Sequence, residues 1–471
     1  MNSKRSSGTL AGGLKRIRGV WQALARGGRT AATPADDSTL GTRQIAQLRR
    51  TLNECVARVG GEVSARRRAA SIGETYLGLN DAGKLAFLRL LASEFEPGPE
   101  AVLVVIRDYL AATGDDARRR CGRAVRDALA SPRSRILPQF STLPEGVQFL
   151  VQLRADVSGL LPKHPELAIL DEELLDLLTS WFDVGLLSLQ RITWNSPAAL
   201  LEKLMTYEAV HEIRSWNDLR NRLDSDRRVY AFFHPRMPLE PLIFIQVALV
   251  HRMADNVQHL LDEGSPTFDA TQADTAIFYS ITNTQAGLRG VPLGNFLIKR
   301  VVDSLRQDFP RLKTFATLSP LPTFRRWLDE RVAADPERAR VAVRSGKATE
   351  TVDLVASLKQ ERWHETPALR AALEGPLLQF GAEYLLDARS EGRPVDPVAR
   401  FHLGNGARIE RLNWLADTSA KGLRQSYGLM VNYLYALDDI ESNHEAYEHD
   451  GAVVASAAVR RLRAKQPRVK P

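Results

Sequence analysis

One stretch of the chain, residues 276–328, constrains the fold more than any other. It reads AIFYSITNTQAGLRGVPLGNFLIKRVVDSLRQDFPRLKTFATLSPLPTFRRWL. An apolar run of strand length leads into a glycine-containing turn, an amphipathic helix pattern follows, and a second strand ends at a lone serine, Ser319. This order predicts a turn at a helix start that binds a phosphorylated carrier, and a hydroxyl placed to act on the group it carries.

The turn at residues 285–292 is suited to a pyrophosphate. Its two glycines allow left-handed backbone, so that successive N–H groups point into one concavity. We expect the helix to begin near Leu293, with Pro292 in its first turn, where a missing N–H costs nothing. The helix start adds about half a positive charge. Whole positive charges come from Arg289, Lys299 and Arg300.

Taken alone, this turn identifies no site, because an ordinary strand-to-helix turn has similar residues. The G-x-x-x-x-G-K-[ST] of a P-loop and the G-x-G-x-x-G of a dinucleotide site do not occur. His444 and His449 are five residues apart, not the four of a metalloprotease helix, and their acidic surroundings predict a solvated loop rather than a metal site. The absence of G-x-S-x-G weakens an α/β-hydrolase interpretation.

Longer strings carry a more specific signal. They are FFHPRMPLEPLIFIQVALV at 232–250, TLSPLPTFRRWL at 317–328 and FHLGNGARIERLNWLADTSAKGLRQSYGLMVNYLY at 401–435. Together with the turn and helix above, and in this order, they resemble the malonyl-CoA decarboxylase family. The resemblance extends from about residue 187 to residue 457.

The resemblance implies an α+β fold, in which an all-helical, bundle-like domain precedes an acetyltransferase-like (GNAT) catalytic domain with a mixed central sheet. It implies conversion of malonyl-CoA to acetyl-CoA and carbon dioxide without a cofactor or a metal, by a homo-oligomer, expected to be a tetramer. The catalytic residues it implies are Ser319, His402 and Tyr435. The coenzyme A loop it implies consists of Arg289, Gly290, Val291, Pro292, Leu293, Gly294 and Asn295. Pro292 departs from the acidic residue of animal members, so no role of that side chain is transferred.

The chemistry is consistent with so few groups. Loss of carbon dioxide from a malonyl thioester leaves an enolate whose charge lies largely on oxygen, so the protein must orient the carboxylate, stabilise the oxyanion and protonate the carbon. Histidine suits protonation because its usual pKa is about 6.5. We assign His402 as the acid and Ser319 as its partner, which binds the carboxylate or relays the proton. Without the surrounding strings, a turn serine and a structural histidine would be the simpler interpretations.

Amino-acid composition limits the classes of partner and the compartment that can be expected for this chain. No apolar run of about 18 residues predicts a membrane span, and two cysteines, Cys55 and Cys121, make no disulfide framework and indicate a reducing compartment. The net charge is +8, yet residues 1–35 and 460–471 carry thirteen Lys or Arg and no acid, so the rest of the chain has a net charge of −5. A nucleic-acid-binding core is therefore disfavoured. We expect a bacterial cytoplasmic enzyme of malonate catabolism and fatty acid metabolism, or one of the mitochondrial matrix if the chain is eukaryotic, because the basic leader also resembles a transit peptide.

Periodicity predicts four segments: a flexible basic tail at 1–38, a helical domain at 39–185, the catalytic domain at 186–457 and a basic tail at 458–471. Leucine stripes such as that of residues 81–95 predict the helices. Strands are expected at 187–194, in an antiparallel hairpin at 229–250, and again at 400–415 after a charged helical insertion at 329–392. Two alternatives to decarboxylation stay open: acyl transfer from an acyl-CoA to an amine, and a non-catalytic acyl-CoA sensor.

Overall fold

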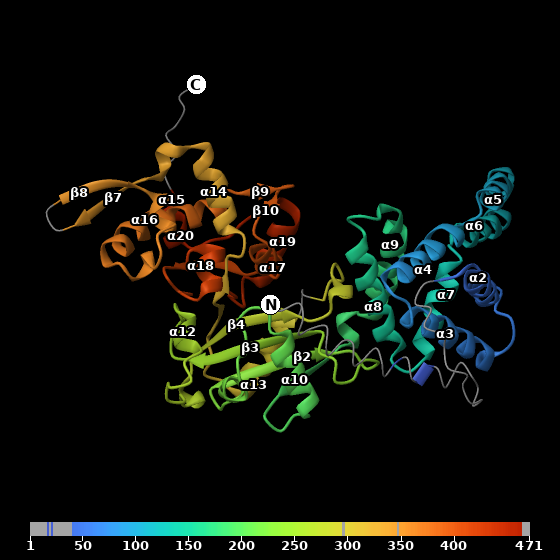
Figure 1. Ribbon diagram of the computed structural model, residues 1–471, viewed down its shortest axis with the longest axis horizontal. Helices are drawn as coiled ribbons and strands as arrows, with labels where there is room; N and C mark the ends of the chain where they lie inside the picture. Colours follow the sequence, from blue (N-terminus) through green and yellow to red (C-terminus); the bar gives the residue numbers. More distant parts are fainter. Residues whose placement is uncertain (1–16, 18–19, 22–39, 294–296, 346–347, 464–471) are drawn as a thin grey trace. The chain divides into compact units, whose positions relative to one another are not determined.

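The computed structural model describes residues 17, 20–21, 40–293, 297–345 and 348–463 (Figure 1). Most of the predicted N-terminal tail, and residues 464–471 of the C-terminal one, lie outside this range. The chain divides into two compact units. The helical unit is Met1–Leu187 with His234–Glu240 and Thr284–Pro292, and the α/β unit is Ser188–Phe233, Pro241–Asn283 and Leu293–Pro471. Two short loops that follow the strands β2 Arg227–Phe233 and β4 Thr275–Asn283 in the chain therefore belong to the helical unit, which periodicity does not reveal.

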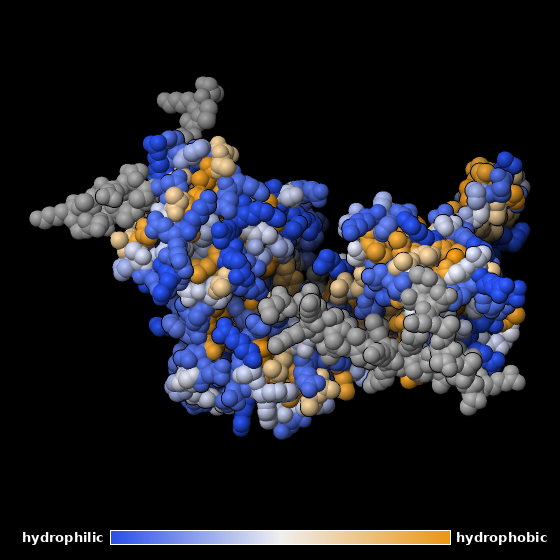
Figure 2. Space-filling view, in the orientation of Figure 1, coloured by the Kyte–Doolittle hydropathy of each residue, from blue (hydrophilic) through white to orange (hydrophobic). Residues whose placement is uncertain are grey.

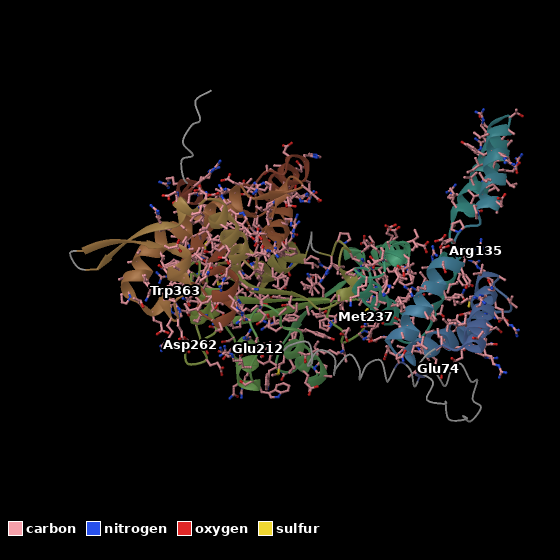
Figure 3. The ribbon with its side chains drawn as sticks, turned by 45° about the horizontal axis from the view of Figure 1, so that its top comes forward. Glu74, Arg135, Glu212, Met237, Asp262 and Trp363 are labelled. Carbon is pink, nitrogen blue, oxygen red and sulfur yellow. The ribbon has the colours of Figure 1, made fainter. Side chains whose placement is uncertain are left out.

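The helical unit is built as its leucine stripes predict. Its helices are α2 Thr42–Val56, α3 Glu62–Leu77, α4 Asp81–Glu94, α5 Pro99–Ala111, α6 Asp115–Leu129, α7 Arg133–Ile136, α8 Gly146–Leu160 and α9 Ala168–Trp181. Asn80 caps α4 by accepting a hydrogen bond from the Gly83 N–H at 2.9 Å. Rings from several helices form the centre of this unit, where Phe149 lies 4.9 Å from Trp21 and 5.8 Å from Tyr76 between ring centroids. Glu74 and Arg135 of this unit are labelled in Figure 3.

The α/β unit contains the predicted mixed sheet, with eight strands. The strands are β1 Ser188–Ile192, β2 Arg227–Phe233, β3 Ile243–Val250, β4 Thr275–Asn283, β5 Thr314–Thr317, β6 Ser319–Pro320, β11 Arg408–Asn413 and β12 Met430–Leu434. Their order is β1-β2-β3-β4-β5-β12-β11, with β6 also paired to β12. β4 and β5 are parallel, whereas the other neighbouring pairs are antiparallel, including the predicted β2–β3 hairpin.

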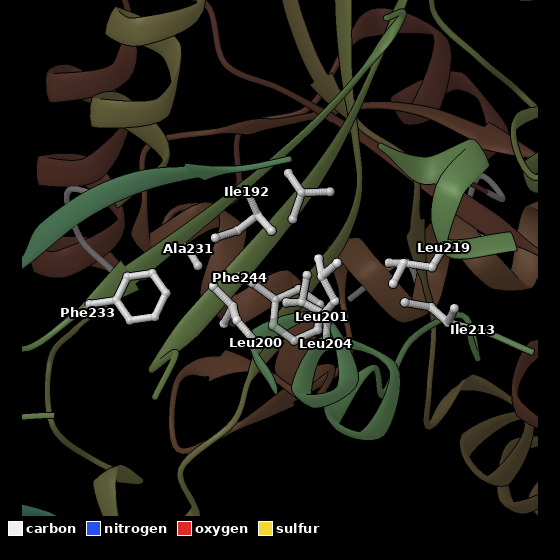
Figure 4. Packing of buried hydrophobic residues seen from close by; sticks show 10 residues of the cluster. Ile192, Leu200, Leu201, Leu204, Ile213, Leu219, Ala231, Phe233 and Phe244 are labelled. Carbon is white, nitrogen blue, oxygen red and sulfur yellow. The ribbon is translucent and has the colours of Figure 1, made fainter. Parts of the chain in front are cut away.

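Helices cover both faces of the sheet, and the alternation of residues along β2 shows how. Val229, Ala231 and Phe233 pack against leucines of α10 on one face (Figure 4). On the opposite face, the Arg300 guanidinium of α13 lies over the Phe232 ring at 5.4 Å. The helices of this unit are α10 Ala198–Tyr207, α11 Trp216–Arg222, α12 Val257–Leu260, α13 Leu297–Asp308, α14 Phe324–Ala334, α15 Leu354–Leu358, α16 Pro367–Leu386, α17 Pro397–Gly404, α18 Ala420–Ser426, α19 Ile440–Asp450 and α20 Ala457–Leu462.

Two expectations from the sequence are wrong, and a third is met in part. The region 400–415 starts not as a strand but with the end of α17, because Asp396 caps a helix with Pro397 in its first turn. The stretch around His444 and His449 is a helix, α19, rather than a solvated loop. The helix expected near Leu293 is α13, whose described part begins at Leu297, whereas Leu293 itself is not helical and residues 294–296 lie outside the described range.

The insertion after α14 is helical as expected in α15 and α16, but it also holds two hairpins. These are β7 Arg340–Ser345 with β8 Ala348–Asp353, and β9 Arg389–Ser390 with β10 Arg393–Pro394. Trp363, labelled in Figure 3, packs its ring 5.8 Å from that of Trp414 and so ties the insertion to the sheet region. Among the described helices, none is long and apolar enough to cross a membrane.

Candidate active site

The site lies where β4 and β5 part. Their parallel ladder runs from Thr275 opposite Thr314 to Phe278 opposite Thr317. Beyond this pair, β4 continues to Asn283, whereas the chain after β5 turns to β12 through β6, with Val431 opposite Ser319. The register between β3 and β4 also shifts at this height, which gives β4 an extra residue at Tyr279. Two neighbouring strands that separate in this way leave a fork at the centre of the sheet.

A cavity of about 220 Å³ occupies the fork, and we call it the active-site cavity. Its walls come from β4, from β6, from the first turns of α17 and from the segment after α10. The lining residues are Val210, Phe278, Tyr279, Ser280, Ile281, Asn283, Ser319, Pro320, Pro397, Val398, Phe401 and His402. Two of the three residues predicted to be catalytic therefore line one cavity, although 83 positions separate them in the chain.

Ser319 is held by a threonine on the same face of its strand. Its hydroxyl donates to Thr317 Oγ1 at 2.8 Å and lies 3.1 Å from His402 Nε2. Thr317 Oγ1 also accepts a hydrogen bond from the Tyr433 backbone N–H at 3.1 Å, so the threonine is itself fixed to β12. Ser319 forms part of a strand and does not start a helix, which removes its simplest structural interpretation.

His402 belongs to α17, and the start of that helix is tightly anchored. The Asp396 carboxylate caps it by accepting from the Ala399 N–H at 2.8 Å, and it accepts a second hydrogen bond from the Tyr384 hydroxyl at 2.8 Å. Burial raises the pKa of Asp396 to about 6. Capping of this kind fixes the helix on which the imidazole is carried.

Tyr435 completes a chain of hydrogen bonds through the imidazole. Its hydroxyl lies 2.7 Å from His402 Nδ1, while Nε2 faces Ser319 on the opposite side of the ring. Burial raises the pKa of Tyr435 well above its usual value, so the phenol is neutral and has a proton to donate. The structure thus brings the three predicted catalytic residues together, and their individual roles stay predictions.

The electrostatics of His402 differ from the sequence-based expectation. Complete burial lowers the pKa of its imidazole to about 3, because a charged ring would be desolvated. The usual value of about 6.5, on which the sequence argument relied, therefore does not hold here. His402 is neutral at physiological pH. Because the Ser319 hydroxyl donates its one proton to Thr317, it accepts from His402 Nε2–H, and Nδ1 then accepts from the Tyr435 hydroxyl.

The predicted coenzyme A loop is built partly as expected. Gly290 has a φ of 88°, the left-handed conformation that the turn was predicted to need. Gly287 is required for a different reason: a Cβ there would lie 1.8 Å from the Val151 carbonyl oxygen of α8, so only glycine allows this approach. Arg154 of α8 then binds the loop by donating to the carbonyls of Gly287 and Arg289 at 2.8 and 2.7 Å. The loop rests on the helical unit.

The remaining loop residues divide between described and undescribed positions. Arg289, Gly290 and Pro292 are exposed, whereas Val291 and Leu293 are buried. Gly294 and Asn295 lie outside the described residues. The Arg289 guanidinium has no ion-pair partner in the described part of the chain, so its charge is free to meet an anion.

Several residues of the site were missed from the sequence. Thr317 could have been found, since period-two alternation places it on the same face as Ser319. Asp396 could also have been found as a cap followed by proline. Glu208 gave no signal: it is a buried carboxylate that accepts from the Ser280 hydroxyl at 2.9 Å and from the Val210 N–H at 2.7 Å. Only the fold shows that Ser280 and Val210 line the cavity.

The chain is similar to known proteins over most of its length. A model of the malonyl-CoA decarboxylase C-terminal domain matches residues 185–470, and one of the malonyl-CoA decarboxylase N-terminal domain matches residues 95–182. The mitochondrial malonyl-CoA decarboxylase of Anser anser anser is 37% identical over 419 residues, which are 84% of this chain and 83% of the relative.

Two crystal structures of bacterial enzymes are also similar. Malonyl-CoA decarboxylase from Rhodopseudomonas palustris is 42% identical with a TM-score of 0.80, and the match covers 88% of this chain and 99% of that one. The enzyme from Agrobacterium vitis is 42% identical with a TM-score of 0.80, over 89% of this chain and 100% of that one. The function predicted from the motifs is confirmed, and the chain belongs to the malonyl-CoA decarboxylase family.

Proposed function

We propose that the fork between β4 and β5 decarboxylates malonyl-CoA through a thioester enolate, which Ser319 and His402 then protonate. The observation that carries the proposal is the hydrogen-bond chain from Tyr435 through His402 to Ser319, which ends at a cavity. No covalent intermediate is needed, because the thioester carbonyl of the substrate accepts the electron pair of the breaking carbon–carbon bond.

The neutral state of His402 changes the identity of the acid. An enolate carbon is a far stronger base than imidazole, so a neutral donor suffices to protonate it. We infer that the Ser319 hydroxyl turns from Thr317 toward the substrate and gives its proton to the carbon, while His402 Nε2–H replaces it. A neutral imidazole held in one tautomer is a known form of catalytic histidine.

The oxyanion also needs donors. The backbone N–H groups of β4 beyond Phe278, on the edge that β5 leaves, are suited to this task, since they border the cavity and no longer have β5 as a ladder partner. Each such donor lowers the barrier by about 3 to 4 kcal/mol when it is aimed at the developing charge. This arrangement requires neither a metal nor a cofactor, and the proposal includes none.

We further propose that the α/β unit has the acetyltransferase-like (GNAT) fold. The supporting features are the parallel β4–β5 pair, the fork that follows it, and a helix, α13, after β4. In the proposal, the loop Arg289–Asn295 binds the phosphates of coenzyme A with its backbone N–H groups and with Arg289.

A homo-oligomer, with a tetramer as the expected form, is also part of the proposal. Its support is a helical hairpin, α5–α6, in which no residue is buried. The side chains of Leu103, Val104, Leu110 and Leu129 are 46%, 53%, 76% and 54% exposed, and they form an apolar surface on this hairpin (Figure 2). A second copy of the chain is the proposed occupant, and Leu110→Glu should lower the molar mass measured by light scattering.

We place the enzyme in a bacterial cytoplasm. Its Arg- and Ala-rich composition and the coverage of bacterial enzymes over nearly their full length favour this location over the mitochondrial one named for the goose relative. Fluorescence microscopy of the tagged full-length chain in bacterial and in animal cells would decide between the two locations. Import into mitochondria would support the mitochondrial one.

The decisive experiment is a discontinuous assay of metal-stripped protein with malonyl-CoA, in which acetyl-CoA is followed by chromatography. Rapid formation of acetyl-CoA without an acceptor supports decarboxylation by the protein's own groups. Dependence on an added amine would support acyl transfer, and binding of malonyl-CoA without turnover would support a sensor. Activity that returns only when a metal is added would contradict the metal-free mechanism.

A further inference from the structure

A second cavity, of about 270 Å³, is bordered by Tyr435, and we call it the Tyr435 cavity. Its walls come from α13, from the end of α17 and from α19. The lining residues are Ile298, Lys299, Val302, Asn405, Tyr435, Ile440, Glu441, His444 and Glu445. The hydrogen bond from Tyr435 to His402 Nδ1 therefore connects this cavity with the active-site cavity, which His402 lines.

The proposed reaction consumes one proton in every turnover. Malonyl-CoA loses its carboxylate as carbon dioxide, the electron pair of the broken bond becomes the enolate, and the enolate carbon takes up a proton to give acetyl-CoA. Since Ser319 and His402 are buried, they must regain that proton before the next turnover. Substrate fills the active-site cavity during the reaction, so a supply from another side is advantageous.

The hydrogen bonds at the site run in one direction. The Tyr435 hydroxyl donates to His402 Nδ1 at 2.7 Å, Nε2–H donates to Ser319 Oγ at 3.1 Å, and the Ser319 hydroxyl donates to Thr317 at 2.8 Å. The first two donors thus point from the Tyr435 cavity toward the active-site cavity, and the Ser319 hydroxyl completes the path when it turns from Thr317 toward the substrate. A shift of protons along this chain moves one proton to the substrate and leaves the deficit on the Tyr435 oxygen.

His444 is placed to collect protons at the Tyr435 cavity. Its Nδ1 donates to the Gly404 carbonyl at 2.7 Å, at the end of the helix that carries His402, so that Nε2 is left as an acceptor. The charged groups facing it are Glu441 and Glu445 from α19 and Lys299 from α13, while α17 contributes the neutral Asn405. Lys299 and Glu441 form an ion pair at 3.4 Å, which keeps this wall polar.

We propose that the Tyr435 cavity is the proton entry of the enzyme, in which His444 takes protons from solvent and Tyr435 relays them to His402. The inference rests on the proposed function of Ser319 and His402. In the balanced step, the Tyr435 hydroxyl proton moves to Nδ1 as Nε2–H moves to Ser319, and water in the cavity, recharged through His444, returns a proton to the Tyr435 oxygen. No oxidant or reductant takes part.

The test compares the kcat of full-length His444→Gln with that of wild type in two buffers. One buffer is too bulky to enter the Tyr435 cavity, and the other is imidazole, which is small enough to enter it. A glutamine amide can still donate to the Gly404 carbonyl, but it cannot carry a proton. We expect kcat to fall about tenfold in the bulky buffer, with KM unchanged and a larger solvent deuterium isotope effect. Imidazole, which is small and titrates near neutrality, should restore kcat.

Two further variants separate the steps. Tyr435→Phe should lower kcat in a way that imidazole does not restore, because the relay itself is missing. His449→Gln is the matched control, since His449 lies on the same helix, is exposed and does not line the cavity, and it should behave as wild type. A His444→Gln enzyme with wild-type kcat and isotope effect, or a loss that imidazole leaves unchanged, overturns the inference. Failure of the proposed function is recognised separately, because wild-type enzyme would then produce no acetyl-CoA.

Discussion

The imidazole of His402 stacks on the ring of Tyr433, with 4.5 Å between the ring centroids and 27° between their planes. This contact sets the plane of the imidazole, so that Nε2 faces Ser319 on one side and Nδ1 faces Tyr435 on the other. Tyr433 contributes its ring alone, because its buried hydroxyl finds no hydrogen-bond partner among the described residues.

The first prediction concerns this ring. Tyr433→Phe removes a buried, unsatisfied hydroxyl and keeps the stacking surface, so stability should stay the same or rise by about 1 kcal/mol, with unchanged kcat. Tyr433→Ala should lower kcat strongly, since the imidazole loses its support. Thermal unfolding and steady-state kinetics check both variants, and a large loss of activity in Tyr433→Phe would show that the hydroxyl has a function.

The catalytic roles can be tested by truncation. His402→Ala should lower kcat by about 100-fold or more with little change in KM, as expected when a proton relay is lost. Ser319→Ala should behave similarly, and the double variant should be no slower than the slower single variant, because both residues act in one step. Acetyl-CoA measured by chromatography gives the rates. Near-normal turnover of either single variant contradicts its role.

Acid should destabilise the protein through His402. Burial lowers its folded pKa to about 3, whereas the unfolded value is about 6.5. The unfolded chain therefore binds the proton more tightly, and the contribution of this group to stability, complete above pH 6.5, is lost as the pH falls toward 3. From pH 7 to pH 5 the loss is about 2 kcal/mol. His402→Gln should reduce the acid sensitivity measured by denaturant unfolding, and an identical pH dependence would contradict this.

Asp396 should matter for the position of His402. Asp396→Ala removes the cap of α17 and the acceptor of the Tyr384 hydroxyl, so stability should fall by about 1 to 3 kcal/mol and kcat should fall as well. Asp396→Asn retains a capping oxygen and removes a buried charge. Burial raises the pKa of Asp396 to about 6, so the free-energy cost of burying its charge grows as the pH rises from about 4 to 6. The stability of Asp396→Asn relative to wild type should therefore be highest at pH 7.

Arg289→Ala tests the proposed phosphate loop. The side chain is exposed, and the loop backbone is fixed independently by Arg154, so the fold should be unaffected. KM for malonyl-CoA should rise about tenfold while kcat changes little, since the phosphates lie far from the reacting atoms. Arg43→Ala, at an exposed arginine of α2, is the matched control. An effect confined to kcat would place Arg289 elsewhere in the mechanism.

Local patterns in the sequence predicted many of the strands and helices, and they predicted the catalytic residues. Alternation and leucine stripes depend only on neighbours in the chain, so β2, β3, β4 and α4 could be predicted from them. The long strings indicated the family and the residues Ser319, His402 and Tyr435. Short elements were less accessible: the strand predicted at 400–415 includes the end of α17, because a helix of only two turns shows little periodicity beside the cap at Asp396.

The surroundings of these residues are visible only in the fold. Desolvation of His402 depends on surroundings that distant segments build, and it lowers the pKa of the imidazole far below the usual value on which the sequence argument relied. The need for glycine at position 287 arises from α8, more than 130 positions earlier in the chain, and not from the turn itself. The connection between the two cavities likewise requires α13, α17 and α19 to meet at Tyr435. Contacts between segments far apart in sequence leave no local pattern, so the fold alone reveals them.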